Sequence, residues 1–165
     1  MKKIAGLIFD LDDTLVDTSL IAPLRQKKAW RACVSSLHKT TLYPDVAEFI
    51  ERARNEKVAI GIVTASVSFY AEAVLRHHGI RYDALVAYHD TQQHKPHPEP
   101  ALLCLEKMGL EAVSVLGIGD SKIDQISYAR AGLISVGAGW SSALDFDADW
   151  DHVAKLPSSI LKARK

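Results

Sequence analysis

Short apolar runs alternate along the chain with segments in which apolar residues recur at helical spacing. Five runs are short and almost entirely apolar, as strands buried on both faces of a sheet are; they cover residues 4–9, 58–63, 84–87, 113–118 and 133–136. Strands that alternate with helices are typical of repeated βαβ units. The pattern therefore predicts an α/β protein built on a parallel sheet of about five strands.

Helical periodicity predicts the elements between these strands. Apolar residues from Leu20 to Leu37 fall largely on one helical face, and those from Val46 to Ala53 do so again. We expect Pro44 in the first turn of the second helix, where a missing N–H costs nothing. Gly79 is expected to end the helix that carries residues 71–75.

The remaining segments are expected to be loops and one short helix. Prolines at positions 96, 98 and 100 make the entry to the next helix a stiff loop. Four aspartates alternate with other residues over positions 145–151, which we interpret as a solvated acidic loop. A short C-terminal helix is expected from about Pro157.

Composition describes an ordinary globular chain. Its 165 residues suit one domain, 48% of them are hydrophobic, and twenty Lys and Arg balance twenty Asp and Glu. A broad polyanion-binding surface would show a basic excess, and Cys33 and Cys104 lie too far apart for a short metal-ligand motif. Residues 4–9 are too short a run for a membrane helix and are followed at once by Asp10, so we expect a cytoplasmic protein without membrane contact.

Chemistry-bearing side chains follow the predicted strands. They are Asp10 and Asp12 after the first strand, Thr64 after the second, Lys95 in the proline-rich loop after the third, and Asp120 and Asp124 after the fourth. Ligands of open α/β sheets lie beyond the carboxyl ends of the strands, so these side chains should meet at one edge. Crowded carboxylates repel unless a cation holds them, and all-oxygen ligation suits Mg²⁺. The sequence therefore predicts a magnesium site.

Four segments in this order resemble the sequence motifs of the haloacid dehalogenase superfamily. The segments are Asp10-Leu11-Asp12-Asp13-Thr14-Leu15, then Thr64, then Lys95-Pro96-His97-Pro98-Glu99-Pro100, and Gly119-Asp120-Ser121 with Asp124. Residues 42–46 and 61–64 further resemble the phosphoglycolate-phosphatase-like branch. The resemblance implies a Rossmann-like three-layer α/β/α sandwich and a single core domain over residues 1–165.

The resemblance also implies roles for the matching residues. Asp10 would be the nucleophile that forms an aspartyl-phosphate, and Asp12 the general acid and base. Thr64 would hydrogen-bond the phosphoryl oxygens, and Lys95 would neutralise their charge. The implied function is that of a Mg²⁺-dependent phosphomonoester phosphatase. Its substrate would be a small phosphorylated metabolite, a nucleotide or a larger anionic phosphate.

The implied metal ligands come from the same motifs. Asp10, Asp120 and the backbone carbonyl of Asp12 would hold Mg²⁺, and Asp124 would act directly or through water. A general acid at Asp12 is what the phosphotransferases of the family carry, whereas its dehalogenases need neither that acid nor Mg²⁺. The resemblance therefore favours phosphate over halide chemistry.

The segment between the first two motifs departs from the branch. Only 54 positions separate Asp10 from Thr64, so we expect residues 18–43 to form a short helical segment in place of an inserted cap. That segment contains no acidic residue, and its basic side chains are Arg25, Lys27, Lys28, Arg31 and Lys39. Next to an open pocket, they could bind the rest of an anionic substrate.

Two other functions use a similar set of residues. A receiver-like signalling domain has an aspartate cluster, a Thr and a Lys, but its phospho-accepting Asp follows a middle strand of the chain. A non-catalytic phosphate-binding module would not need every catalytic position. Ser66 and Ser121 could touch phosphate or cap helices, and Trp30 and Trp140 could flank the pocket or merely pack.

Overall fold

The computed structural model describes residues 3–145 and 150–162, and within them six parallel strands form the main sheet. The strands are β1 (Gly6–Phe9), β4 (Ala59–Val63), β5 (Ala84–Val86), β6 (Val115–Gly119), β7 (Ile134–Ala138) and β8 (His152–Ala154). Their spatial order is β5-β4-β1-β6-β7-β8. Because β1 pairs with both β4 and β6, the residues that follow these three strands share one edge of the sheet.

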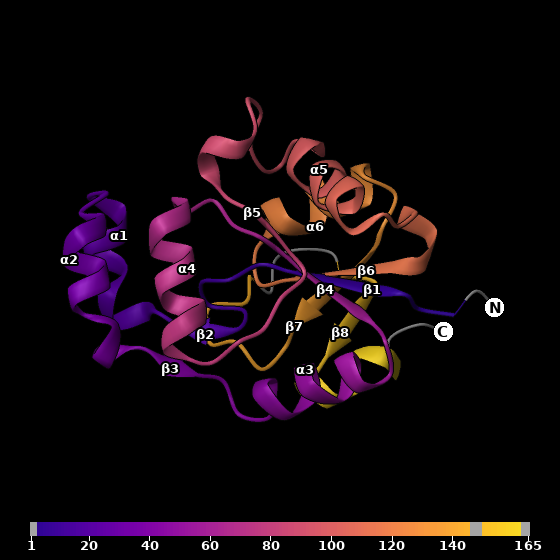
Figure 1. Ribbon diagram of the computed structural model, residues 1–165, viewed down its shortest axis with the longest axis horizontal. Coiled ribbons are helices and arrows are strands. Elements are labelled where there is room, and N and C mark those ends of the chain that lie inside the picture. Colours follow the sequence, from indigo (N-terminus) through magenta and orange to yellow (C-terminus); the bar gives the residue numbers. More distant parts are fainter. Residues whose placement is uncertain (1–2, 146–149, 163–165) are drawn as a thin grey trace.

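Helices cover both faces of the sheet (Figure 1). One face packs against α3 (Val46–Asn55), α4 (Ser68–His77) and the 3-10 helix η5 (Pro157–Lys162), and the other against α5 (Glu99–Met108) and α6 (Lys122–Arg130). The expected three-layer sandwich is thereby confirmed. In the described part of the chain, no helix combines the length and the apolar character needed to cross a membrane.

Two glycines of β6 set how closely α6 approaches the sheet. A Cβ atom added at Gly117 would lie 2.4 Å from the ring of Tyr128, and one added at Gly119 would lie 2.4 Å from the Cβ atom of Asp124. Only glycine leaves room for these contacts. The close approach of α6 to the sheet therefore depends on the two glycines of β6, and this approach brings Asp124 to the sheet edge.

The sixth strand, β8, is absent from the sequence-based expectation. It pairs in parallel with β7, Val136 opposite His152. The strand has three residues, and Val153 is 46% exposed at the edge of the sheet, so no continuous apolar run marks it. The expected acidic loop includes residues 146–149, which lie outside the described part, whereas the expected C-terminal helix is present as η5.

The single helix expected from Leu20 to Leu37 is wrong. The chain instead forms two short α-helices, each flanked by a 3-10 helix, namely η1 (Ser19–Ile21), α1 (Ala22–Gln26), α2 (Trp30–Ser35) and η2 (Leu37–Lys39). Lys28 lies between the α-helices with a φ of +55°, a left-handed conformation that interrupts a helix. The apolar face continues across the break, so periodicity alone could not reveal it.

A small antiparallel sheet ties the two ends of this segment together. It pairs β2 (Val16–Asp17) with β3 (Thr41–Leu42). The segment lies outside α4 (Figure 1), where Trp30 of α2 packs against Tyr70 of α4 with ring centroids 5.3 Å apart. Residues 18–43 are therefore anchored to the core at their base and along one side.

The remaining helix boundaries follow expectation with one exception. Pro44 precedes α3 instead of lying in its first turn, because Asp45 adopts a φ of +65° and the helix begins at Val46. Gly79, with a φ of +67°, follows α4 as expected. The 3-10 helices η3 (Tyr88–Asp90) and η4 (Ala112–Ser114) complete the described elements.

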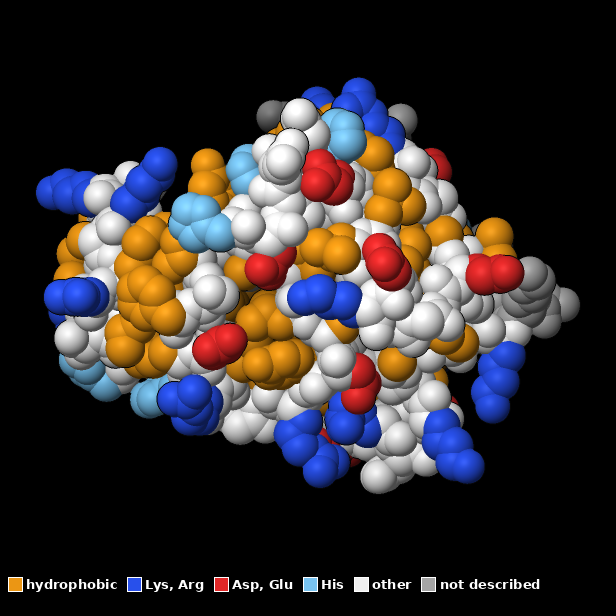
Figure 2. All heavy atoms as spheres, turned by 45° about the horizontal axis from the view of Figure 1, so that its top comes forward, with side chains coloured by type: hydrophobic (Ala, Val, Ile, Leu, Met, Phe, Trp, Pro, Cys, Tyr) orange, Lys and Arg blue, Asp and Glu red, His pale blue; other side chains and the backbone are white. Residues whose placement is uncertain are grey.

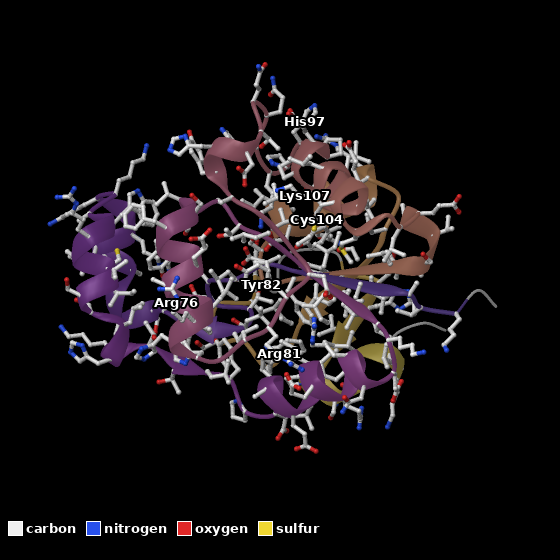
Figure 3. All side chains as sticks on the ribbon, viewed as in Figure 1. Arg76, Arg81, Tyr82, His97, Cys104 and Lys107 are labelled. Carbon is white, nitrogen blue, oxygen red and sulfur yellow. The ribbon has the colours of Figure 1, made fainter. Side chains whose placement is uncertain are left out.

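A surface ion pair connects the segment after α4 with α3. Arg81 points toward α3 (Figure 3), where its guanidinium donates to both carboxylate oxygens of Glu51 at 3.1 and 2.9 Å. Both side chains are largely exposed, so we expect this contact to contribute less than about 1 kcal/mol to stability.

Candidate active site

Lys95 connects the ends of two strands and a helix at the centre of the site. Its Nζ donates to Oδ1 of Asp10 at 2.9 Å, to Oδ1 of Asp124 at 2.6 Å and to the carbonyl of Val63 at 3.0 Å. The Lys95 side chain is 3% exposed. The loop after β5 therefore places a buried ammonium between the end of β1 and the start of α6.

Three carboxylates converge around this ammonium. One oxygen each of Asp10, Asp120 and Asp124 lies within 4.8 Å of the others. The Thr14 hydroxyl donates to Asp120 at 2.9 Å and lies 3.3 Å from Asp10, so it bridges two of them. Asp124 in turn accepts from the hydroxyl and N–H of Ser121, the N-cap residue of α6, and so closes the first turn of that helix as in a capping box.

The electrostatics of this cluster are unbalanced. Burial and the neighbouring Asp124 raise the pKa of Asp10 well above its usual value, although Lys95 opposes the shift. Burial, and again Asp124, raises the pKa of Asp120 to about 6. Burial alone would lower the pKa of Lys95, but Asp10 and Asp124 outweigh it and raise that pKa. Three carboxylates facing one ammonium form a donor set that fits a hard divalent cation.

Asp12 lies in a separate hydrogen-bonded setting. Its Oδ1 accepts from the hydroxyls of Thr18 at 2.9 Å and Tyr70 at 2.6 Å, and its Oδ2 accepts from the Ser66 hydroxyl at 2.8 Å. Nε of Arg25 lies 3.5 Å from Oδ1. The side chain of Asp12 is therefore held apart from the acidic cluster, and only its backbone carbonyl is left as the expected metal ligand.

All six residues singled out from the sequence line one open hollow of about 190 Å³. They are Asp10, Asp12, Thr64, Lys95, Asp120 and Asp124. The Oγ1 of Thr64 accepts from the backbone N–H of Ser66, which fixes its orientation beside the carboxylates. The structure thus gathers a hydroxyl, an ammonium and two separately held sets of carboxylates, which is an arrangement suited to phosphoryl transfer.

Several contacts of the site were not expected from the sequence. Tyr70 and Thr18 hold Asp12, Arg25 reaches it from α1, and Trp140 donates from its indole to the carbonyl of Thr14 at 2.8 Å. Tyr70 lies in α4, but Ser66 precedes that helix, so no helical spacing links the two residues. Thr18 lies six residues after Asp12, and Arg25 and Trp140 come from other segments, so none of these contacts carries a local signal.

The geometry decides one alternative for Ser66 and shows what Asp13 does. Ser66 caps no helix, because α4 is preceded by Val67, and its hydroxyl serves Asp12 instead. Asp13 stabilises the loop after β1, with a φ of +63° and a carboxylate that accepts from the N–H of Thr18 and pairs with Arg25 at 3.3 Å.

The chain is similar in sequence to proteins named as phosphatases. A pyrophosphatase PpaX from Oceanobacillus iheyensis is 29% identical over 61% of this chain and 48% of its own length. The phosphoglycolate phosphatase of Escherichia coli K12 is 32% identical over 59% of this chain and 40% of its own, so these matches span about half of each relative. Their names agree with the expectation of a phosphatase.

Solved structures share the fold. CbbY from Rhodobacter sphaeroides, solved in complex with phosphate, superimposes with a TM-score of 0.79 at 16% identity and covers 95% of this chain and 96% of its own. The profile of the family described as haloacid dehalogenase-like hydrolase matches residues 21–138. This match covers most of the chain, which therefore belongs to the haloacid dehalogenase-like hydrolases.

Proposed function

We propose that this protein is a Mg²⁺-dependent phosphomonoester phosphatase that works through an aspartyl-phosphate. The observation that carries the proposal is the pair Asp10 and Asp12. Lys95 holds the first carboxylate within the acidic cluster, and three hydroxyls hold the second in the same hollow. The names of the relatives and the phosphate held by CbbY support the same chemistry.

The proposal assigns a role in the reaction to each of four residues. The carboxylate of Asp10 attacks phosphorus, and the bond from phosphorus to the ester oxygen breaks while Asp12 protonates the departing alkoxide. Water next attacks the aspartyl-phosphate, Asp12 accepts its proton, and inorganic phosphate and Asp10 are released. Thr64 and Lys95 hydrogen-bond the phosphoryl oxygens throughout.

The acidic cluster supplies the proposed metal site. Asp10, Asp120 and Asp124, with the backbone carbonyl of Asp12, would hold Mg²⁺. When bound, the ion supplies positive charge that neutralises the phosphoryl oxygens. Thr14 and Ser121 keep the carboxylates oriented toward it by the hydrogen bonds described above.

We further propose that residues 18–43 stand in place of a cap and that the chain works as a single core domain. The segment lies beside the hollow, which stays open to solvent. Small phosphorylated substrates would enter freely, and larger anionic phosphates could extend over the segment. Its exposed basic residues Lys27, Lys28 and Arg31 are the groups that would meet them.

Turnover of a chromogenic phosphomonoester tests the proposal. The protein is incubated with p-nitrophenyl phosphate in Mg²⁺ and, separately, in EDTA, and we expect release of nitrophenolate only with the metal. Absence of turnover on a broad phosphomonoester panel would contradict a phosphatase. Stable labelling by acetyl phosphate without turnover would instead favour the receiver-like alternative.

Magnesium is expected to stabilise the folded chain more at pH 7.5 than at pH 5. Metal binding needs ionised carboxylates, and the pKa of Asp120, raised to about 6, leaves that carboxyl largely protonated at pH 5. At a hundred times its dissociation constant, the ion would add about 2.7 kcal/mol, or roughly 5 °C or more in Tm. Differential scanning fluorimetry with and without Mg²⁺ measures the gain in Tm at each of the two pH values. An equal gain at the two pH values, or a gain retained in Asp120→Asn, would place the metal elsewhere.

Arg25 is expected to contribute to substrate binding. Its guanidinium lines the catalytic hollow, and its buried Nε has no hydrogen-bond partner in the structure. A charge-assisted hydrogen bond to a phosphoryl oxygen is worth about 1.5–3 kcal/mol, so Arg25→Gln should raise KM for p-nitrophenyl phosphate at least about tenfold. Arg31→Gln, in the same segment but exposed, is the matched control. A KM equal to that of the control would exclude this role.

A further inference from the structure

A second hollow adjoins the catalytic one. It has a volume of about 140 Å³ and is lined by Lys28, Trp30, Ala65, Val67, Tyr88 and His89. Ala65 stands between Thr64 and Ser66 and lines both hollows. A molecule whose phosphate occupies the first hollow would therefore pass over Ala65 into the second.

Two aromatic side chains from different segments form its walls. Trp30 comes from α2 and Tyr88 from η3. Tyr88 stacks on His94, with ring centroids 4.0 Å apart and an interplanar angle of 16°, and His94 directly precedes Lys95. The Trp30 wall is also held by a residue of the catalytic site, because Trp30 packs on Tyr70, whose hydroxyl donates to Asp12. Both rings are thus fixed by neighbours of the catalytic groups.

The lining of this hollow is apolar and basic. Lys28 and His89 are its ionisable groups apart from the Tyr88 phenol, and none of its lining residues is acidic. In Figure 2, hydrophobic side chains gather on the left of the view, the side on which α2 and α4 lie in Figure 1, with histidines next to them. A flat ring with hydrogen-bond acceptors at its edge suits such a lining, whereas a cationic group does not.

We propose that this second hollow is the leaving-group subsite and that it takes a planar ring of nucleobase type, which makes nucleoside monophosphates the substrate class. This inference rests on the proposed phosphatase function. The phosphate lies in the first hollow, the sugar crosses Ala65, and the base stacks on Trp30 and Tyr88. Lys28 and His89 donate to acceptor atoms on the edge of the base.

A matched pair of substrates isolates the subsite. Uridine 5′-monophosphate and ribose 5-phosphate differ only at C1, where the sugar phosphate has a hydroxyl in place of the base, so the ratio of their kcat/KM values measures what the base contributes. We expect the wild-type protein to prefer the nucleotide at least about tenfold, and Tyr88→Leu or Trp30→Leu to lower that ratio about tenfold, as the loss of one stacking contact does. Phe69→Leu is the control, because Phe69 is an aromatic residue on α4 that is 49% exposed and lines neither hollow.

The ratio separates the subsite from general damage. A variant that merely disturbs Asp12 through Tyr70 lowers both kcat/KM values and leaves their ratio unchanged, and the same ratio in wild type and both variants would overturn the subsite. Calorimetry on Asp10→Asn extends the test to a chain without turnover. There we expect uridine 5′-monophosphate to bind more tightly than ribose 5-phosphate, and Tyr88→Leu to remove the difference. If the wild-type protein hydrolysed neither substrate but this difference in binding were found, the proposed phosphatase activity would be contradicted and the subsite would stand.

Discussion

Replacing Asp10 by Asn is expected to lower kcat for any phosphomonoester by at least about 10⁴-fold. An amide cannot attack phosphorus as a carboxylate does, and loss of a nucleophile typically removes most of an enzyme's rate enhancement. Asn keeps the size of the side chain and can still accept the hydrogen bond from Lys95 at 2.9 Å. The loss should therefore appear in kcat, measured by steady-state phosphate release, while the fold is retained.

Asp17→Asn is the matched control for this variant. Asp17 lies seven residues after Asp10 at the end of β2, but its carboxylate accepts from the N–H and hydroxyl of Ser19 and lines neither hollow. We expect its kcat within about twofold of the wild type, since surface substitutions have small effects. Turnover that persists in Asp10→Asn would show that another group attacks phosphorus, and the aspartyl-phosphate would then be abandoned.

The fold was predictable where local sequence decides it. The strands β1, β4, β5, β6 and β7 are marked by apolar runs, and the residues after them converge because parallel strands end at one edge. The strand β8 has no such run, since half of its middle residue faces solvent. The apolar face continues on both sides of the break at Lys28, so helical periodicity predicts one continuous helix there.

The candidate site also has a part that local sequence predicts and a part that it does not. The six residues singled out from the sequence follow predictable strands and line one hollow; they are Asp10, Asp12, Thr64, Lys95, Asp120 and Asp124. The surroundings of Asp12 depend instead on tertiary packing. Arg25 reaches Asp12 from α1, and Trp30 packs on Tyr70 from α2, because the segment lies against α4. No spacing in the sequence encodes that approach.

Lys95→Met is expected to lower both activity and stability. Lys95 is 3% exposed and pairs with two buried carboxylates, so its removal leaves Asp10 and Asp124 without their cation. Breaking a buried ion pair in this way costs about 3–5 kcal/mol. We expect that decrease in the free energy of unfolding in urea at pH 7.5 without Mg²⁺, together with loss of turnover. Lys107→Met is the matched control, because its exposed ammonium likewise donates to a strand carbonyl, that of Leu85 at 3.0 Å (Figure 3).

The stability lost in Lys95→Met should become smaller as the pH falls, because of the titration of Asp10. Its pKa in the folded chain already lies well above the usual 3.8, chiefly because of burial, and loss of Lys95 raises it further. A carboxyl whose pKa is higher in the folded than in the unfolded chain favours folding at low pH, and that contribution is lost as pH rises toward the folded value. The variant should therefore approach the wild type between pH 7.5 and pH 5. A deficit that stays constant over this range would mean that lost packing, and not unpaired charge, explains the effect.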